Sequence, residues 1–408
     1  MRCGLVRVFV AGMLCLHLFL FINLRGRIEQ GYPDFTAFYT AATLLRHGLG
    51  HQLYNPKIQY EAQKSFAGNI SSRRGPLPYI HPPFEALIFL PLTLLPYTQA
   101  FMVWDLLALL ALFFVACLLR RSVPTLRSIA PWKFVFASLA FFPIFDCLLQ
   151  GQDSVLLLLL CTLGFDALKR ETNFLAGCWF ALGAFKFQWI LPIIVLIVVW
   201  KVKRVAAGFA MVSLILAFVS IGLVGWQNML HYPAYVLRVV NTPSFGGVGS
   251  EIMPNLRGLL TGWRWPFLRA VGSIMAVSSA VILFFLAATK GRGESHPQRP
   301  ELQFSLAVLV SGLIGWHTNA HDLALLILPL VLVTDYCVQT QAQEPAYRFA
   351  LLLPAFPTVI SPLWIVLWFV GGHLNLMAIT LLWWTCKIGM ELARDLHLPS
   401  GVQHLTSS

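Results

Sequence analysis

Residues with possible chemistry are concentrated in short polar segments between long apolar runs. The first of them, Asp34, opens the longest polar segment of the chain. Only 17 of the 408 residues are acidic, and a charged group at a membrane boundary usually faces a cavity or a partner. A carboxylate in such a place can act as a general base, which takes a proton from a reacting group. Asp34 is therefore our candidate for a catalytic residue.

Other polar residues are expected at the same face of the membrane as Asp34. They are His81, Gln152, Asp153, Lys186, Arg257, Asn319, His321 and Asp322. Each has a simpler explanation when it is taken alone: Lys186 can extend to the interface, and Asp153 can cap the helix that follows it. Because five such clusters fall on one side, we interpret them together as a substrate-binding site.

The composition indicates an all-α polytopic membrane protein. Hydrophobic residues make up 58% of the chain and charged residues 11%, whereas soluble domains are about a quarter charged. Apolar runs long enough to cross a bilayer predict about 12 transmembrane helices in a single domain, residues 1–408. The net charge of +12 comes mostly from loops between these runs, which indicates topology rather than nucleic-acid binding.

The distribution of Lys and Arg predicts which loops lie outside the cytoplasm. The first span, 5–24, is expected to start in the cytoplasm, so that residues 25–82 form a first external loop with amphipathic helices near 35–47 and 57–66. The apolar stretch 83–95 is too short to span. A second long external loop is expected at 226–266. We expect both chain ends to be cytoplasmic.

No cofactor and no metal is expected from the sequence. His317 and His321 are four residues apart, which could place both on one helix face, but a metal needs three or four well-placed ligands and only Asp322 is nearby. The spacing does not decide which of the two histidines is functional. The chain has no phosphate-binding glycine loop and no HExxH motif, and its eight cysteines are scattered.

The order of several short motifs resembles glycosyltransferase family 87, the polyprenol-phosphate-mannose-dependent mannosyltransferases. These motifs are Asp34 with the aromatic helical pattern after it, Leu53-Tyr54-Asn55-Pro56, Tyr79-Ile80-His81-Pro82-Pro83-Phe84, Gly151-Gln152, Lys186 and His321-Asp322. The resemblance covers about Pro33 to Leu330. Related enzymes often carry two adjacent acids in the first loop, whereas Asp34 stands between Pro33 and Phe35, which argues against a metal in this loop.

The resemblance implies a helical membrane enzyme that moves a hexose, mannose in this family, from a polyprenyl-phosphate carrier to a glycan, lipid or glycolipid acceptor. It implies Asp34 as general base, inversion at the anomeric carbon, and cations such as Lys186, Arg257 and His321 beside the leaving phosphate. The expected location is the extracytoplasmic side of a bacterial plasma membrane. Two alternatives stay open: a transporter or flippase of a lipid-linked sugar, and a non-catalytic scaffold.

Overall fold

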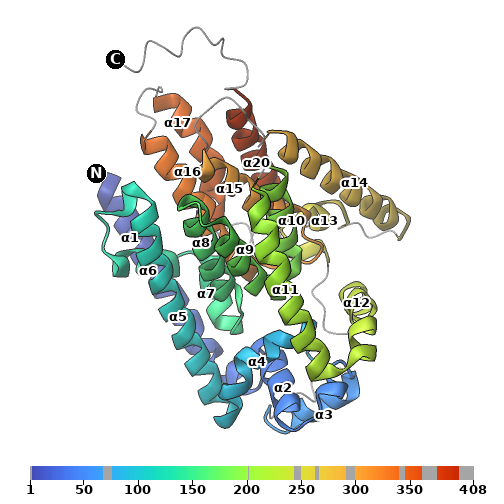
Figure 1. The fold of residues 1–408 in the computed structure, drawn as a ribbon. Coiled ribbons are helices and arrows are strands. Elements are labelled where there is room, and N and C mark those ends of the chain that lie inside the picture. Colours follow the sequence, from blue (N-terminus) through green and yellow to red (C-terminus); the bar gives the residue numbers. More distant parts are fainter. Residues whose placement is uncertain are drawn as a thin grey trace.

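Apolar helices joined by short turns make up the computed structural model (Figure 1). It describes residues 2–67, 76–200, 202–242, 250–261, 266–290, 299–339, 345–360 and 375–394, and no β-strand occurs among them. The prediction of an all-α polytopic membrane protein is confirmed. The count of about 12 spans is not: six helices in the described part are long and apolar enough to cross a bilayer, or eight if each of two bent pairs is one span.

The six single spans lie in α1 (Arg2–Glu29), α5 (Tyr97–Ser122), α11 (Lys203–Val224), α14 (Pro266–Lys290), the segment His321–Gln339 that ends in α16 (Ile327–Gln339), and α20 (Leu376–Arg394). Shorter helices complete the bundle: α8 (Ser154–Lys169), α13 (Leu256–Thr261), α15 (Pro300–Ile314), α17 (Pro345–Leu352) and α18 (Phe356–Val359). The last expected pair of spans, 348–369 and 373–390, lies partly outside the described residues, as do parts of the 226–266 loop.

Two bent helix pairs explain part of the difference in the span count. Helices α6 (Pro131–Leu139) and α7 (Phe142–Gln150) meet at 79°, and α9 (Asn173–Leu182) and α10 (Phe187–Val199) meet at 67°. The second pair corresponds to the apolar runs 174–185 and 187–200, which the prediction of about 12 spans counts as two. At this bend a Cβ on Gly183 would lie 2.9 Å from a methyl of Leu157. The close packing at Gly183 brings the loop with Lys186 against α8.

The bundle core holds these bends in place. Helices α8, α10, α15, α16 and α20 pack around a continuous apolar cluster that includes the fully buried Trp189 and Trp384. Helices α1, α11 and α14 instead expose much of their apolar surface, for example Phe218 and Phe285. Such faces are expected where helices contact lipid.

The first long loop folds as the sequence predicts. Its two amphipathic helices are α2 (Phe35–Arg46) and α3 (Pro56–Lys64). The stretch at 83–95 forms short helices around α4 (Ala86–Phe89), a segment shorter than the described spans. The rings of Phe38 and Phe89 stack with centroids 4.7 Å apart, which joins α2 to this segment. The bounds 25–82 and 226–266 for the two external loops remain predictions.

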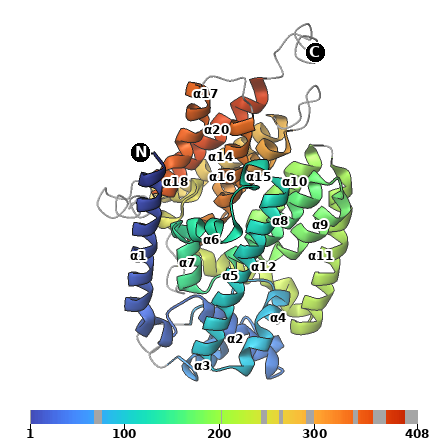
Figure 2. The same ribbon diagram turned by 90° about the vertical axis from the view of Figure 1, so that its left-hand side faces the viewer.

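The basic ends of α5 and α8 lie at the opposite end of the bundle from the first loop. At the upper end in Figure 1, Lys169 Nζ lies 2.6 Å from the Ser122 carbonyl oxygen and 2.6 Å from Glu301 Oε1, which joins the ends of α5 and α8 to the start of α15. Helices α2, α3 and α4 form the lower end, where α12 (Trp226–Asn241) joins them in Figures 1 and 2. The start of α1 and the end of α20 lie toward the upper end.

Candidate functional site

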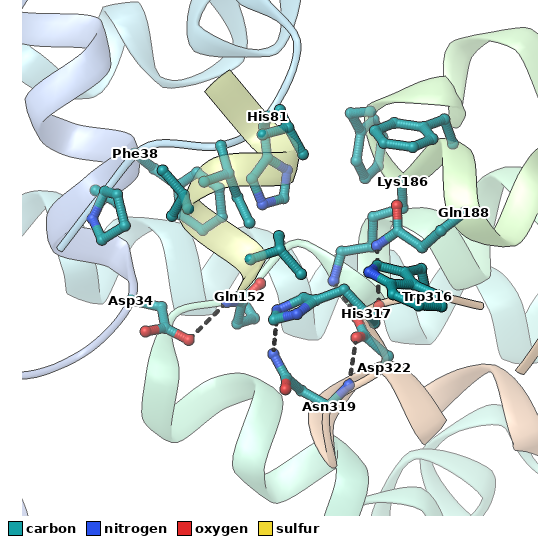
Figure 3. A pocket seen from close by; sticks show the side chains of 18 of the residues that line it. Asp34, Phe38, His81, Gln152, Lys186, Gln188, Trp316, His317, Asn319 and Asp322 are labelled. Carbon is teal, nitrogen blue, oxygen red and sulfur yellow. Dashed lines mark hydrogen bonds and ion pairs between the residues drawn. The ribbon is translucent and has the colours of Figure 1, made fainter. Parts of the chain in front are cut away.

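A cavity of about 220 Å³ lies between the first loop and the helix bends (Figure 3). Seven of the nine residues that the sequence analysis selects line it: Asp34, His81, Gln152, Lys186, Asn319, His321 and Asp322. The other two, Asp153 and Arg257, lie behind its wall. Residues from four separate loops therefore meet in one place, which is the arrangement that a binding or catalytic site requires.

Asp34 lies at the cavity edge, immediately before α2, and is partly exposed. Gln152 Nε2 donates a hydrogen bond of 2.8 Å to Asp34 Oδ2. Gln152 is placed by Gly151, which ends α7 in the left-handed conformation with φ +59°. A Cβ on Gly151 would lie 2.7 Å from the Cβ of Phe35, so this turn needs glycine. The contact between the turn and α2 fixes the amide of Gln152 toward the carboxylate.

Lys186 is the centre of a buried network of charges. Its Nζ lies 2.8 Å from Asp153 Oδ1 and 2.7 Å from Ser154 Oγ, and it also pairs with Asp322 Oδ1. All three charged side chains are at most 3% exposed. The Asn319 backbone N–H donates to Asp322 Oδ2 over 2.8 Å. An ammonium has three donors, and these three acceptors occupy them.

Glu85 joins this network, although the sequence analysis does not select it. It is fully buried, and Tyr79 Oη donates to its Oε2 over 3.1 Å. His81 Nδ1 lies 3.0 Å from Glu85 Oε2 and 3.5 Å from Asp153 Oδ2. Burial, together with the nearby Asp153 carboxylate, raises the pKa of Glu85 well above its ordinary value. The sequence does contain a signal that could have identified Glu85, because it is an acidic residue inside an apolar run.

The same signal marks Asp146, a second residue that the sequence analysis does not select. Asp146 Oδ2 lies 3.7 Å from His321 Nδ1, and His321 Nε2 lies 3.7 Å from Asp322 Oδ1. His321 therefore stands between two carboxylates at the cavity wall. Such a position favours an imidazolium, and the two acids fix the orientation of its ring.

His317 lies in the loop before His321 and also lines the cavity. Its Nε2 is 3.3 Å from Asn319 Nδ2. Burial lowers the pKa of His317 to about 4, so this ring is neutral at pH 7. The two histidines therefore differ in charge environment: His321 lies between two acids, whereas His317 contacts an amide.

Arg257 supports the cavity wall from behind. Its Nη1 donates to the Trp316 carbonyl oxygen over 3.0 Å, and its guanidinium lies 4.4 Å from the centroid of the Trp316 ring. Its Nη2 donates to Asn241 Oδ1 over 3.0 Å, which joins α13 to the end of α12. In this arrangement Arg257 positions Trp316 and α12.

One side of the cavity is apolar. Phe38, Phe185 and Trp316 contribute aromatic surface, and Val236 and Val239 of the amphipathic helix α12 close the side. The cavity thus combines an ionised floor with a wall suited to an amphiphilic ligand.

The cavity thus brings a candidate base and a lipid-compatible wall together in a helical membrane bundle. Residues 79–316 match the family model described as Glycosyltransferase family 87. The match covers more than half of the 408 residues, and the chain belongs to this family. It is a membrane glycosyltransferase. No curated protein matches the chain. The matched segment includes His81, Gln152 and Lys186 but begins after Asp34.

Proposed function

We propose that this glycosyltransferase moves a hexose, mannose by analogy with the family, from a polyprenyl-phosphate carrier to a glycan, lipid or glycolipid acceptor. The cavity supports this proposal through its two contrasting walls. An apolar wall suits the first part of a polyprenyl chain, and a polar floor suits the sugar and phosphate. The observation that carries the proposal is the position of Asp34, a hydrogen-bonded carboxylate at the edge of the cavity.

Asp34 is proposed as the general base. Its carboxylate takes the proton of the acceptor hydroxyl as that oxygen attacks the anomeric carbon of the donor. The bond from that carbon to the carrier phosphate breaks, and the phosphate leaves with the electron pair. Direct displacement inverts the anomeric centre. The hydrogen bond that Gln152 donates orients the Asp34 carboxylate toward the cavity edge.

The leaving phosphate needs positive charge beside it. His321 is proposed for this role because two carboxylates favour its charged form, and His81 and Asn319 offer further polar contacts at the cavity wall. Lys186 lines the cavity too and is proposed to contact the phosphate. Its three donors are occupied, so this contact requires Lys186 to exchange Ser154 or one carboxylate for a phosphate oxygen.

The site is proposed to face the extracytoplasmic side. The ends of α5 and α8, which carry Arg120, Arg121 and Lys169, lie at the opposite end of the bundle from α2, the helix that Asp34 precedes. Cytoplasmic loops carry the excess of Lys and Arg in membrane proteins. This orientation, in a bacterial plasma membrane, gives access to carrier-linked sugars outside the cytoplasm.

The test is transfer by the purified protein. Protein in detergent or nanodiscs is incubated with radiolabelled polyprenyl-phosphate-mannose and a membrane lipid extract. The proposal expects label to appear in an acceptor product and not in water-soluble mannose. Absence of product with mannose, glucose and galactose donors alike would refute hexosyl transfer. Movement of intact labelled carrier across a vesicle membrane would instead support a flippase.

A further inference from the structure

The carboxylates around the cavity outnumber the cations that face it. Lys186 is the one lysine or arginine among the described residues that line it. It shares two acids, Asp153 and Asp322, and Glu85 lies against this pair. Asp34 adds a further carboxylate at the edge. Even with His321 charged, the three aspartates Asp34, Asp153 and Asp322 outnumber the two cations, so a site that must accept an anionic carrier phosphate, as the proposed function requires, needs additional positive charge.

Glu85, Asp153 and His81 converge at one point beside the floor. Their ligand atoms, one from each residue, all lie within 4.8 Å of one another. His81 Nδ1 lies 3.0 Å from one carboxylate oxygen and 3.5 Å from the other. Two ligands of the same zinc ion, each about 2.1 Å from it, are separated by about 3.0–3.4 Å in octahedral or tetrahedral geometry. The two distances from His81 Nδ1 to the carboxylate oxygens are close to this separation.

The hydrogen bonding of the three side chains points the same way. Glu85 and Asp153 are at most 1% exposed. Even so, His81 Nδ1, Glu85 Oε1 and Asp153 Oδ2 are buried and make no hydrogen bond of acceptable geometry, whereas Glu85 Oε2, which lies 3.0 Å from His81 Nδ1, accepts from Tyr79. Buried polar atoms are costly without a partner. Either a proton shared by the two carboxyl groups or a metal ion can relieve this arrangement, and only the ion engages all three side chains.

We propose that His81, Glu85 and Asp153 bind a divalent metal ion, Zn²⁺ or Mn²⁺, beside the donor cavity. One imidazole and two carboxylates form a ligand set that both ions accept. Lys186 then contacts the Asp153 oxygen that lies away from His81, as an outer partner that orients this ligand. The charge argument rests on the proposed function, whereas the geometry does not. The ion would offset the excess of acids and attract an anionic phosphate.

The experiment measures bound metal, independently of glycosyl transfer. Protein carrying a histidine-free affinity tag is stripped with a chelator, incubated with Zn²⁺ or Mn²⁺, and desalted. Metal content is then determined by mass spectrometry, and the melting temperature by intrinsic fluorescence. Glu85→Gln removes a ligand with little change of shape. Glu391→Gln is the matched control, because Glu391 is also buried but its bonds to Arg299 and Tyr336 lie among α15, α16 and α20.

We expect about one metal ion per chain and a raised melting temperature for the wild type and for Glu391→Gln. Glu85→Gln should retain less than a tenth of the metal and show no shift. His81→Ala provides a second test if Glu85→Gln does not fold. Wild-type protein that binds neither ion would overturn the proposal and leave a shared proton as the explanation. Full metal retention in both ligand variants would also overturn it. Metal binding without hexosyl transfer would refute the proposed function alone.

Discussion

Removal of Lys186 should destabilise the protein strongly, and removal of Asp322 as well should restore part of the loss. In the wild type one ammonium compensates two carboxylates that are at most 2% exposed. Lys186→Met leaves both acids without their cation, and breaking a buried pair in this way costs about 3–5 kcal/mol. In Lys186→Met/Asp322→Asn the number of unpaired acids falls by one. The two substitutions should therefore not be additive.

The assay is a double-mutant cycle by denaturant titration in detergent micelles. We expect the double variant to lose less free energy of unfolding than the two single variants lose in sum. The difference, which is the coupling energy, should be about 1–3 kcal/mol. Donor affinity is measured on the same proteins. A double variant that recovers stability but still binds the donor poorly would assign Lys186 to the phosphate. Additive losses would refute the account of a shared buried charge network, and unchanged donor affinity would leave Lys186 a purely structural role.

Three further predictions concern the turn at Gly151, His317 and the topology. Gly151→Ala should destabilise the protein by more than about 1 kcal/mol and slow transfer, since the turn has φ +59° and a Cβ would meet Phe35; unchanged melting and turnover would contradict this reading. His317 binds a proton with a pKa of about 4 when folded and 6.5 when unfolded, so the unfolded state takes up more protons between these values and stability falls as pH drops from 6.5 toward 4. At about 1.4 kcal/mol per pKa unit the loss is at most about 3 kcal/mol, and His317→Gln should flatten this pH dependence in thermal melts; an unchanged slope would refute it. In a cysteine-free background, Lys57→Cys should react with an impermeant maleimide on intact cells and Ser128→Cys only after lysis, since both positions are exposed and lie at opposite ends of the bundle; the reverse pattern would place the cavity on the cytoplasmic side.

The sequence was sufficient to predict the membrane class and much of the convergence at the cavity. Asp34, Gln152, Lys186 and Asp322 each follow or interrupt an apolar run, and the alternation of such runs brings their ends to one face. The amphipathic helices α2 and α3 could be predicted for a similar reason, because their apolar periodicity and the breakers between them are local features.

The remaining features depend on tertiary packing. The bend at Gly183 joins the runs 174–185 and 187–200, which the prediction of about 12 spans counts separately, and the length of a run contains no information on bending. Glu85 lies inside the apolar stretch 83–95, and its proximity to Asp153 at the start of α8 is a tertiary contact that sequence separation does not indicate. Arg257 lies in a long predicted loop. The pattern of charges along the sequence does not indicate whether its guanidinium contacts a substrate or, as in the structure, Trp316.

The central claim is that Asp34 is the base of a hexosyl transfer, and the most direct measurement is the single-turnover rate of Asp34→Asn. The substitution keeps the shape of the side chain and removes its basicity. With donor bound to the same extent, transfer should slow by about 100-fold or more, the range usual for acid–base catalysis. Glu61→Gln, which changes an exposed acid on α3, serves as the control and should transfer at the wild-type rate. A folded Asp34→Asn protein that transfers at a near-normal rate would contradict the assignment.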